Sequence, residues 1–231
     1  MFNFDLENIN MLEVLCGFLV RIIIIVAILP LHECAHGWVA KKLGDPTAQM
    51  LGRVTLNPVK HIEPTGAILL ILFGFGWAKP VPVYSGNFRM KNKKLGMAIT
   101  AAAGPLSNFI AAFVGVIILK LVSLGLAQSN PELYFNLFVY VFGPFILVNL
   151  SLMLFNLIPI QPLDGSRILS VLLPDKWIYQ IESFIRKITD IHPALYFVGF
   201  YIILNFLGVF TLIGWGASGI FNGFIHLFGV V

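Results

Sequence analysis

The chain has 231 residues, of which 58% are apolar and only 11% are charged. Soluble domains average about a quarter charged residues, and a chain this short cannot hide so much apolar surface in a core of its own. The composition therefore excludes a soluble enzyme and a disordered scaffold, and it identifies lipid as the solvent. The net charge of +4 is explained by the Lys/Arg excess of cytoplasmic loops, so we expect no nucleic-acid partner.

Apolar stretches of about 20 residues predict where the chain crosses the bilayer. Four such spans are expected, at residues 19–40, 96–119, within 133–163, and 194–213. The glycine-rich tail 214–231 is left open as a further span. Residues 64–78 are apolar but too few to cross, which favours a re-entrant or interfacial element.

The segment 175–189 alternates apolar and charged residues at helical spacing, which predicts an amphipathic helix on the inner membrane surface. Lysine and arginine clusters follow the first span, precede the second and follow the third. All three clusters fall on the cytoplasmic side if the N-terminus is outside. The sequence thus predicts a multi-pass protein of the cell membrane.

We expect an all-α polytopic fold, a helical bundle of about 4–6 transmembrane segments. The whole chain, 1–231, is predicted to form one integral-membrane domain with its core at 15–175. Residues 176–231 would then supply the surface helix and the C-terminal transmembrane segment or segments.

The first span carries His32, Glu33 and His36 in the pattern H-E-x-x-H. Ionisable side chains are costly in lipid, so these three residues are functional candidates. Positions i and i+4 share one face of a helix, which lets both imidazoles bind one metal ion. Zinc suits this donor set, and Glu33 is placed to act as a general base. The sequence therefore predicts one zinc ion per chain.

A catalytic zinc usually has three protein ligands and one open position. Asp164 stands apart among the other carboxylates, because it closes the third apolar stretch in N-L-I-P-I-Q-P-L-D-G at 156–165. Pro159 and Pro162 exclude a regular helix there, and such backbone is tolerated at membrane depth only inside protein or beside a wet cavity. The alternative for Asp164 is an N-terminal cap of the helical segment that follows.

The two motifs, in this order, resemble the site-2 protease family of intramembrane zinc metalloproteases, in its compact prokaryotic form without PDZ or CBS domains. The resemblance spans residues 15–175 and includes G-R-V-T-L-N-P at 52–58, G-W-A-K-P-V-P-V at 76–83 and A-G-P-L-S-N at 103–108. It implies zinc binding by His32, His36 and Asp164. It also implies that Glu33 is the catalytic carboxylate and that Asn108 and Asn156 help to shape the site.

The resemblance further implies hydrolysis of a peptide bond within or near the transmembrane helix of a membrane-anchored substrate. Single-pass membrane proteins and signal-peptide-like segments are the expected substrates, and the active site is expected towards the cytoplasmic leaflet. A small membrane-associated β element at 50–56 and 79–84, between the first two core helices, would pair with the unwound substrate. The alternative for these two segments is an ordinary inner-surface loop. The sequence does not predict the oligomeric state.

Three other functions compete with this hypothesis. A non-hydrolytic metal-binding membrane protein or transporter explains buried ligands but gives no role to Glu33. A membrane zincin that trims prenylated proteins takes a glutamate as third ligand, and neither Glu132 nor Glu182 lies at a suitable place. A pseudoprotease would have lost a motif residue, and none is missing.

Overall fold

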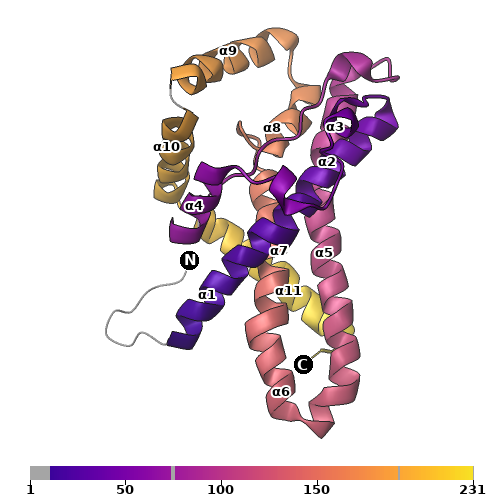
Figure 1. Cartoon of the computed structure of the whole chain (residues 1–231), viewed down its shortest axis with the longest axis vertical. Coiled ribbons are helices and arrows are strands. Elements are labelled where there is room, and N and C mark those ends of the chain that lie inside the picture. Colours follow the sequence, from indigo (N-terminus) through magenta and orange to yellow (C-terminus); the bar gives the residue numbers. More distant parts are fainter. Residues whose placement is uncertain (1–10, 74–75, 192, 231) are drawn as a thin grey trace.

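A computed structural model describes residues 11–73, 76–191 and 193–230. Helices dominate these residues, in agreement with the all-α expectation, and Figure 1 shows their arrangement. In chain order they are α1 (Met11–Ile23), α2 (Leu29–Leu43), α3 (Thr47–Met50), α4 (Pro64–Phe73), α5 (Lys93–Ser129), α6 (Pro131–Leu137), α7 (Gly143–Asn156), α8 (Asp164–Leu169), α9 (Asp175–Ile191), α10 (Pro193–Phe206) and α11 (Val209–Phe228).

Three helical stretches are long and apolar enough to cross a membrane: Phe18–Leu43, Lys93–Ser129 and Pro131–Asn156. A fourth crossing is reached only if the bent pair Tyr196–Phe206 and Val209–Phe228 counts as one span. The expected multi-pass character is therefore confirmed. The described residues contain three spans, or four if the bent pair is counted, so the expected count of 4–6 is not supported.

The predicted helix 194–213 is wrong in its extent. The chain turns by 70° between α10 and α11, and Gly208 sits at the break with φ +69°. Such a left-handed conformation is open to glycine but strained for other residues. The helix therefore ends before Gly208, and most of the tail left open in the sequence belongs to α11.

Two wide π-helical turns interrupt otherwise continuous spans, at Ile24–Ile28 and Phe138–Phe142. Each lies directly before a helix with proline in its first turn, Pro30 in α2 and Pro144 in α7. Proline has no N–H to donate and its ring crowds the preceding turn. A π turn changes the spacing of the main-chain hydrogen bonds locally. The helical stretch can therefore continue through the proline in both places.

The expected β element is absent from the described residues. Segment 50–56 begins at the end of α3 and then turns at Gly52, whose φ is +66°. Segment 79–84 forms no ladder. Its two prolines, Pro80 and Pro82, cannot donate the hydrogen bonds that a strand requires. Side chains, described below, bind its main chain instead.

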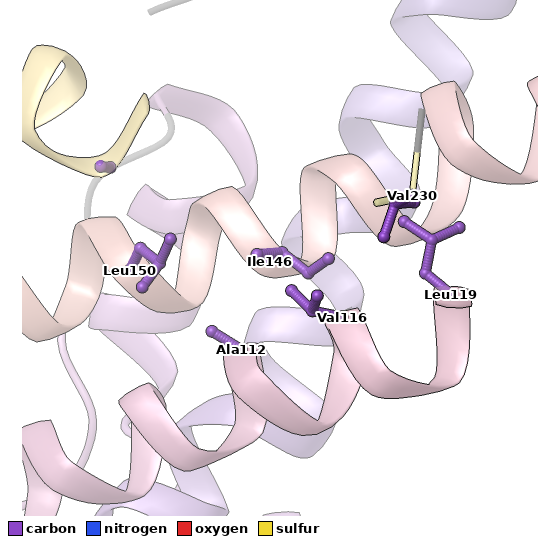
Figure 2. Close-up of a cluster of buried hydrophobic side chains, with 7 residues drawn as sticks. Ala112, Val116, Leu119, Ile146, Leu150 and Val230 are labelled. Atoms are coloured by element: carbon purple, nitrogen blue, oxygen red, sulfur yellow. The ribbon is translucent and has the colours of Figure 1, made fainter. Parts of the chain in front are cut away.

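Helix α5 is the central element and contacts α2, α7, α8 and α11. Figure 2 shows the apolar cluster that fills its contact with α7 and α11, formed by Ala112, Val116, Leu119, Ile146, Leu150, Ala217 and Val230. The opposite face of α5 exposes a helical stripe of apolar side chains, Leu106, Ile110, Val114, Ile117, Leu121 and Leu124. An exposed stripe of this kind suits a lipid-facing surface.

Helix α4 has ten residues, about 15 Å of helix, which is too short to cross a bilayer. The guanidinium of Arg21, in α1, donates to the carbonyl of Ile71 near the end of α4. The last carbonyls of a helix lack partners within the helix, so this contact holds α4 against the first span. Helix α9 has the amphipathic pattern expected of 175–189, with Trp177 and Phe184 exposed; its place on the membrane surface stays a prediction.

Candidate metal centre

Three side chains from two distant segments meet at the interior of the helical bundle. His32 and His36 lie on α2 and Asp164 is the first residue of α8. The two histidine Nε2 atoms are 3.1 Å apart, and Asp164 Oδ2 lies 3.2 Å from one and 3.3 Å from the other. The three atoms thus form a nearly equilateral triangle. His32 and His36 are buried, and Asp164 is mostly so.

The other ring nitrogens of the two histidines are both engaged. His36 Nδ1 lies 2.8 Å from the carbonyl oxygen of Thr100, and a carbonyl can only accept, so His36 donates there. His32 Nδ1 lies 2.9 Å from Asn108 Oδ1, again an acceptor. In a neutral imidazole, protonation at Nδ1 leaves Nε2 with a lone pair. Both Nε2 lone pairs therefore face the Asp164 carboxylate.

When both imidazoles are neutral, this arrangement places three electron pairs together with no proton between them. Among the described residues, no hydrogen-bond donor reaches the buried Oδ2 atom of Asp164. An unpaired buried charge is costly unless a cation compensates it. The donor set is one that zinc takes, and ligands about 2.0–2.1 Å from a tetrahedral zinc ion are about 3.3–3.4 Å apart. The observed sides of 3.1, 3.2 and 3.3 Å are close to that separation, so the residues fit zinc.

Gly104 of α5 makes room for the triangle. A Cβ atom at this position would lie inside contact distance of His36 Nε2 and His32 Nε2. Neither ring could retreat without losing its Nδ1 partner. Glycine is required here because the helix passes directly against the two imidazoles.

Asp164 is not an N-terminal cap, so that alternative is wrong. The cap position of α8 is Leu163, with no side-chain cap hydrogen bond, and the Asp164 carboxylate points to the histidines instead. The turns after α7 are packed tightly against α8 at Gly165, where a Cβ would collide with the carbonyls of Leu157 and Ile158. This close packing sets the position of the carboxylate next to it.

Glu33 follows the first histidine on α2. One of its carboxylate oxygens, Oε2, accepts a hydrogen bond of 3.0 Å from the main-chain N–H of Val81. The carboxylate of the residue next to the His32 ligand is therefore bound by a segment 48 residues away in sequence. The role of Glu33 as a general base next to a metal-bound water stays a prediction.

The two asparagines proposed to shape the site differ in the structure. Asn108 is buried and contacts His32 as described. Asn156 ends α7 and donates to the carbonyl of Leu152 in its own helix. The structure thus brings Asn108 to the cluster and gives Asn156 a local contact.

Sequence reasoning missed the groups that orient the site from behind. They are the Thr100 carbonyl, the Val81 N–H and Gly104, whose lack of a side chain leaves room for the two imidazole rings. Two are main-chain atoms, for which the side-chain pattern carries no signal. Gly104 does have a signal, because it lies in A-A-A-G-P, a run of small residues within a predicted span, and small residues mark close helix contacts in membranes.

Comparison with known proteins places the chain in a family. The sequence matches the profile of peptidase family M50 over residues 20–137 and 123–203, which is more than half of the chain. The chain belongs to peptidase family M50. The resemblance to site-2 proteases is thereby confirmed, and with it the expected class of enzyme, a zinc metalloprotease.

Curated relatives agree with this assignment. The chain is 40% identical over 159 residues to "Putative zinc metalloprotease YwhC" of Bacillus subtilis, covering 66% of this chain and 68% of the relative. It is 31% identical over 149 residues to "Zinc metalloprotease MJ0392" of Methanocaldococcus jannaschii, covering 64% of this chain and 33% of that protein. A third match, to "Putative zinc metalloprotease Rip2" of Mycolicibacterium smegmatis, is 25% identical and covers 58% of this chain and 50% of the relative. No solved structure matches the chain.

Proposed function

We propose that this M50 peptidase cuts a peptide bond within or near the transmembrane helix of membrane-anchored substrates. The observation that carries the proposal is the triangle of His32, His36 and Asp164 ligand atoms beside Glu33, in a helical stretch long enough to cross a membrane. His32, His36 and Asp164 would hold one zinc ion. Bound zinc would polarise the scissile carbonyl and bring the pKa of a water towards 7.

In this proposal Glu33 is the general base and then the general acid. Its free oxygen takes a proton from the attacking water and passes it to the leaving amine. Asn108 and the Thr100 carbonyl keep the two imidazoles in the tautomer that leaves Nε2 free. Such partners behind the ligands also raise ligand basicity.

The site is proposed to open towards the cytoplasmic leaflet of the cell membrane. His36 and His32 lie seven and eleven residues before the end of α2, about 10 and 16 Å by helix rise. Lys41 and Lys42 mark that end, and such clusters favour the cytoplasmic side. The site is thus shallow enough for water to enter from that side.

The proposed substrates are single-pass membrane proteins or signal-peptide-like segments. The lipid bilayer is a further expected partner, because a substrate helix must reach the site laterally through the lipid. Unwound backbone in lipid needs hydrogen-bond partners, so substrates with weak helix formers near the cut are expected to be cleaved first.

The test combines metal analysis with cleavage of a detergent-solubilised single-pass substrate. Glu33→Gln should keep zinc and lose cleavage, whereas His36→Ala and Asp164→Ala should lose both. Glu132→Gln changes an exposed carboxylate in the first turn of α6 and serves as the matched control. Cleavage by Glu33→Gln at the wild-type rate would contradict the mechanism, and zinc binding by a wild type that cuts nothing would favour the non-hydrolytic alternative.

A further inference from the structure

A short segment after α4 crosses α2 at the catalytic motif. It consists of residues 79–83, Lys-Pro-Val-Pro-Val, and is called the arm below. Proline fixes φ at about −65°, and the residue before a proline is pushed to extended backbone. Since the arm alternates prolines with other residues, its sequence makes it straight and stiff.

Arg53 holds the arm from one side. Its guanidinium is buried, with 7% of the residue exposed. Nη2 donates to the Lys79 carbonyl at 2.6 Å and Nη1 donates to the Pro80 carbonyl at 3.2 Å. Hydrogen bonds from a charged donor are about twice as strong as neutral ones. The preceding main chain is fixed as well, because the N–H of Lys79 donates to the carbonyl of His61.

Val81 holds the arm from the other side. Its main-chain N–H donates to Glu33 Oε2 at 3.0 Å, and its side chain is buried. Gly37 lies one turn after Glu33 on α2, and a Cβ there would meet Val81 Cγ1 at 3.4 Å and Val54 Cγ2 at 3.1 Å. The arm therefore packs against α2 near Gly37, within van der Waals reach of the helix that carries Glu33.

The flanking prolines leave one donor at this place. Pro80 and Pro82 have no N–H, so Val81 supplies the single main-chain N–H of residues 80–82. It binds Oε2, and the described contacts of Glu33 include no hydrogen bond to Oε1. A carboxylate held by one oxygen keeps the other available and cannot rotate freely about its side chain.

We propose that the arm orients the catalytic carboxylate, with Arg53 and Val81 as positioning residues. Arg53 fixes the two carbonyls, and the N–H that follows them anchors Glu33 Oε2 so that Oε1 faces the reacting water. The inference rests on the proposed role of Glu33 as general base. A general base that is held in the correct orientation towards the water lowers the barrier of the chemical step. Misplacement of a catalytic group by about 1 Å can reduce the rate about 100-fold.

Val81→Pro tests the proposal because it deletes the N–H and keeps an apolar residue of similar size in an extended segment. Val81→Ala is the matched control, since it shortens the same side chain and keeps the N–H. We expect Val81→Pro to retain zinc and KM while kcat falls about tenfold to 100-fold. Val81→Ala keeps the N–H, so its kcat should fall less than that of Val81→Pro. Equal kcat values for the two variants, or loss of zinc in Val81→Pro, would overturn the proposal.

Arg53 gives a second series that does not depend on how well Val81→Pro folds. Arg53→Lys keeps a donor that can reach one carbonyl, and Arg53→Met keeps only the apolar stem. The proposal expects kcat to fall in the order wild type, Arg53→Lys, Arg53→Met, with zinc content and KM unchanged. A loss of thermal stability with unchanged kcat would show that Arg53 is merely structural.

Combination with Glu33→Gln separates this inference from the proposed function. If the arm acts through Glu33, adding Val81→Pro to Glu33→Gln lowers the residual rate no further. If Glu33→Gln abolishes cleavage while Val81→Pro and the Arg53 series leave kcat unchanged, the inference fails and the proposed function stands. If Glu33→Gln leaves cleavage intact, the proposed function fails first.

Discussion

The two halves of α5 perform different tasks with the same secondary structure. The first half faces α2 and α8 and carries small or polar buried residues, among them Gly96, Thr100, Gly104 and Asn108. The second half faces α7 and α11 and buries Ala112, Val116 and Leu119 in the apolar cluster of Figure 2. One end supplies room and hydrogen-bond acceptors to the metal centre, and the other fills space.

The difference teaches how a membrane helix can carry a polar site without losing stability. Lipid is as apolar as leucine, so helix association depends on close packing and on satisfied polar groups. Matched residues at the two ends of the bundle allow the contributions of close packing and of satisfied polar groups to be measured separately. Gly104 and Gly115 are glycines of α5, and Asn108 and Asn149 are buried asparagines of the two facing helices.

The largest effect is expected from Gly104→Ala. The new Cβ would overlap the two Nε2 atoms, so the rings must turn away and zinc and cleavage should fall by at least about 100-fold, the upper range for disturbance around a metal site. Gly115→Ala is the control, because its Cβ meets Ile146 and Phe145 side chains at 3.1–3.2 Å. Metal analysis and cleavage rates measure both variants. Equal zinc content in Gly104→Ala and Gly115→Ala would contradict the geometry described.

A smaller loss is expected from Asn108→Ala. His32 would lose the acceptor that fixes its tautomer, which typically costs about 10–100-fold in metal affinity or activity. Asn149→Ala removes a buried asparagine that donates to the Phe145 carbonyl in its own helix, and it should leave zinc affinity unchanged. Competition with a chelator gives the affinities. If the two variants lose zinc equally, Asn108 acts through packing alone.

The smallest effect concerns Asp45, which ties the end of α2 to the segment after the arm. Burial by itself raises the pKa of Asp45, but hydrogen bonds from Thr47, the Asn87 amide and the Tyr84 N–H outweigh burial and hold this pKa below its ordinary value. A lowered folded-state pKa contributes stability above the unfolded pKa, about 3.9, and the contribution is lost as pH falls through the folded value.

Asp45→Asn should therefore destabilise the protein by about 1–3 kcal/mol at neutral pH, and the difference from wild type should shrink as the pH falls below about 4. Thermal unfolding in detergent across this range measures it. Asp175→Asn removes an exposed carboxylate paired with Lys94 and should cost less, because exposed ion pairs contribute little. A difference that stays constant with pH would show that the charge of Asp45 is irrelevant.

Much of the metal centre could be predicted from the sequence. Ionisable residues in apolar spans are rare enough to stand out, and the helical period places His32 and His36 on one face. Asp164 could be singled out because prolines end the helix before it. The choice between Asn108 and Asn156 could not be made, since it depends on how α5 is rotated against α2.

The sequence predicts the parts of the fold that depend on composition. It does not predict the parts that depend on tertiary contacts. Three spans lie where apolar length placed them. The break at Gly208 was missed because a single glycine within a span is compatible with a straight helix or a bend. The β element was wrong because β-branched residues and prolines suit both an edge strand and an isolated extended segment. Arg53 and Glu33, rather than a neighbouring strand, bind the main chain at 79–81.

Two of the atoms that aim the reactive groups, the Thr100 oxygen and the Val81 amide, belong to the peptide backbone. Every amino acid offers the first and all but proline offer the second. An alanine scan would therefore pass over both positions, and drift of their side chains during evolution would leave the chemistry intact. A change in the course of the main chain, such as a one-residue deletion between α4 and α5, would inactivate the enzyme even though every recognised motif residue was retained.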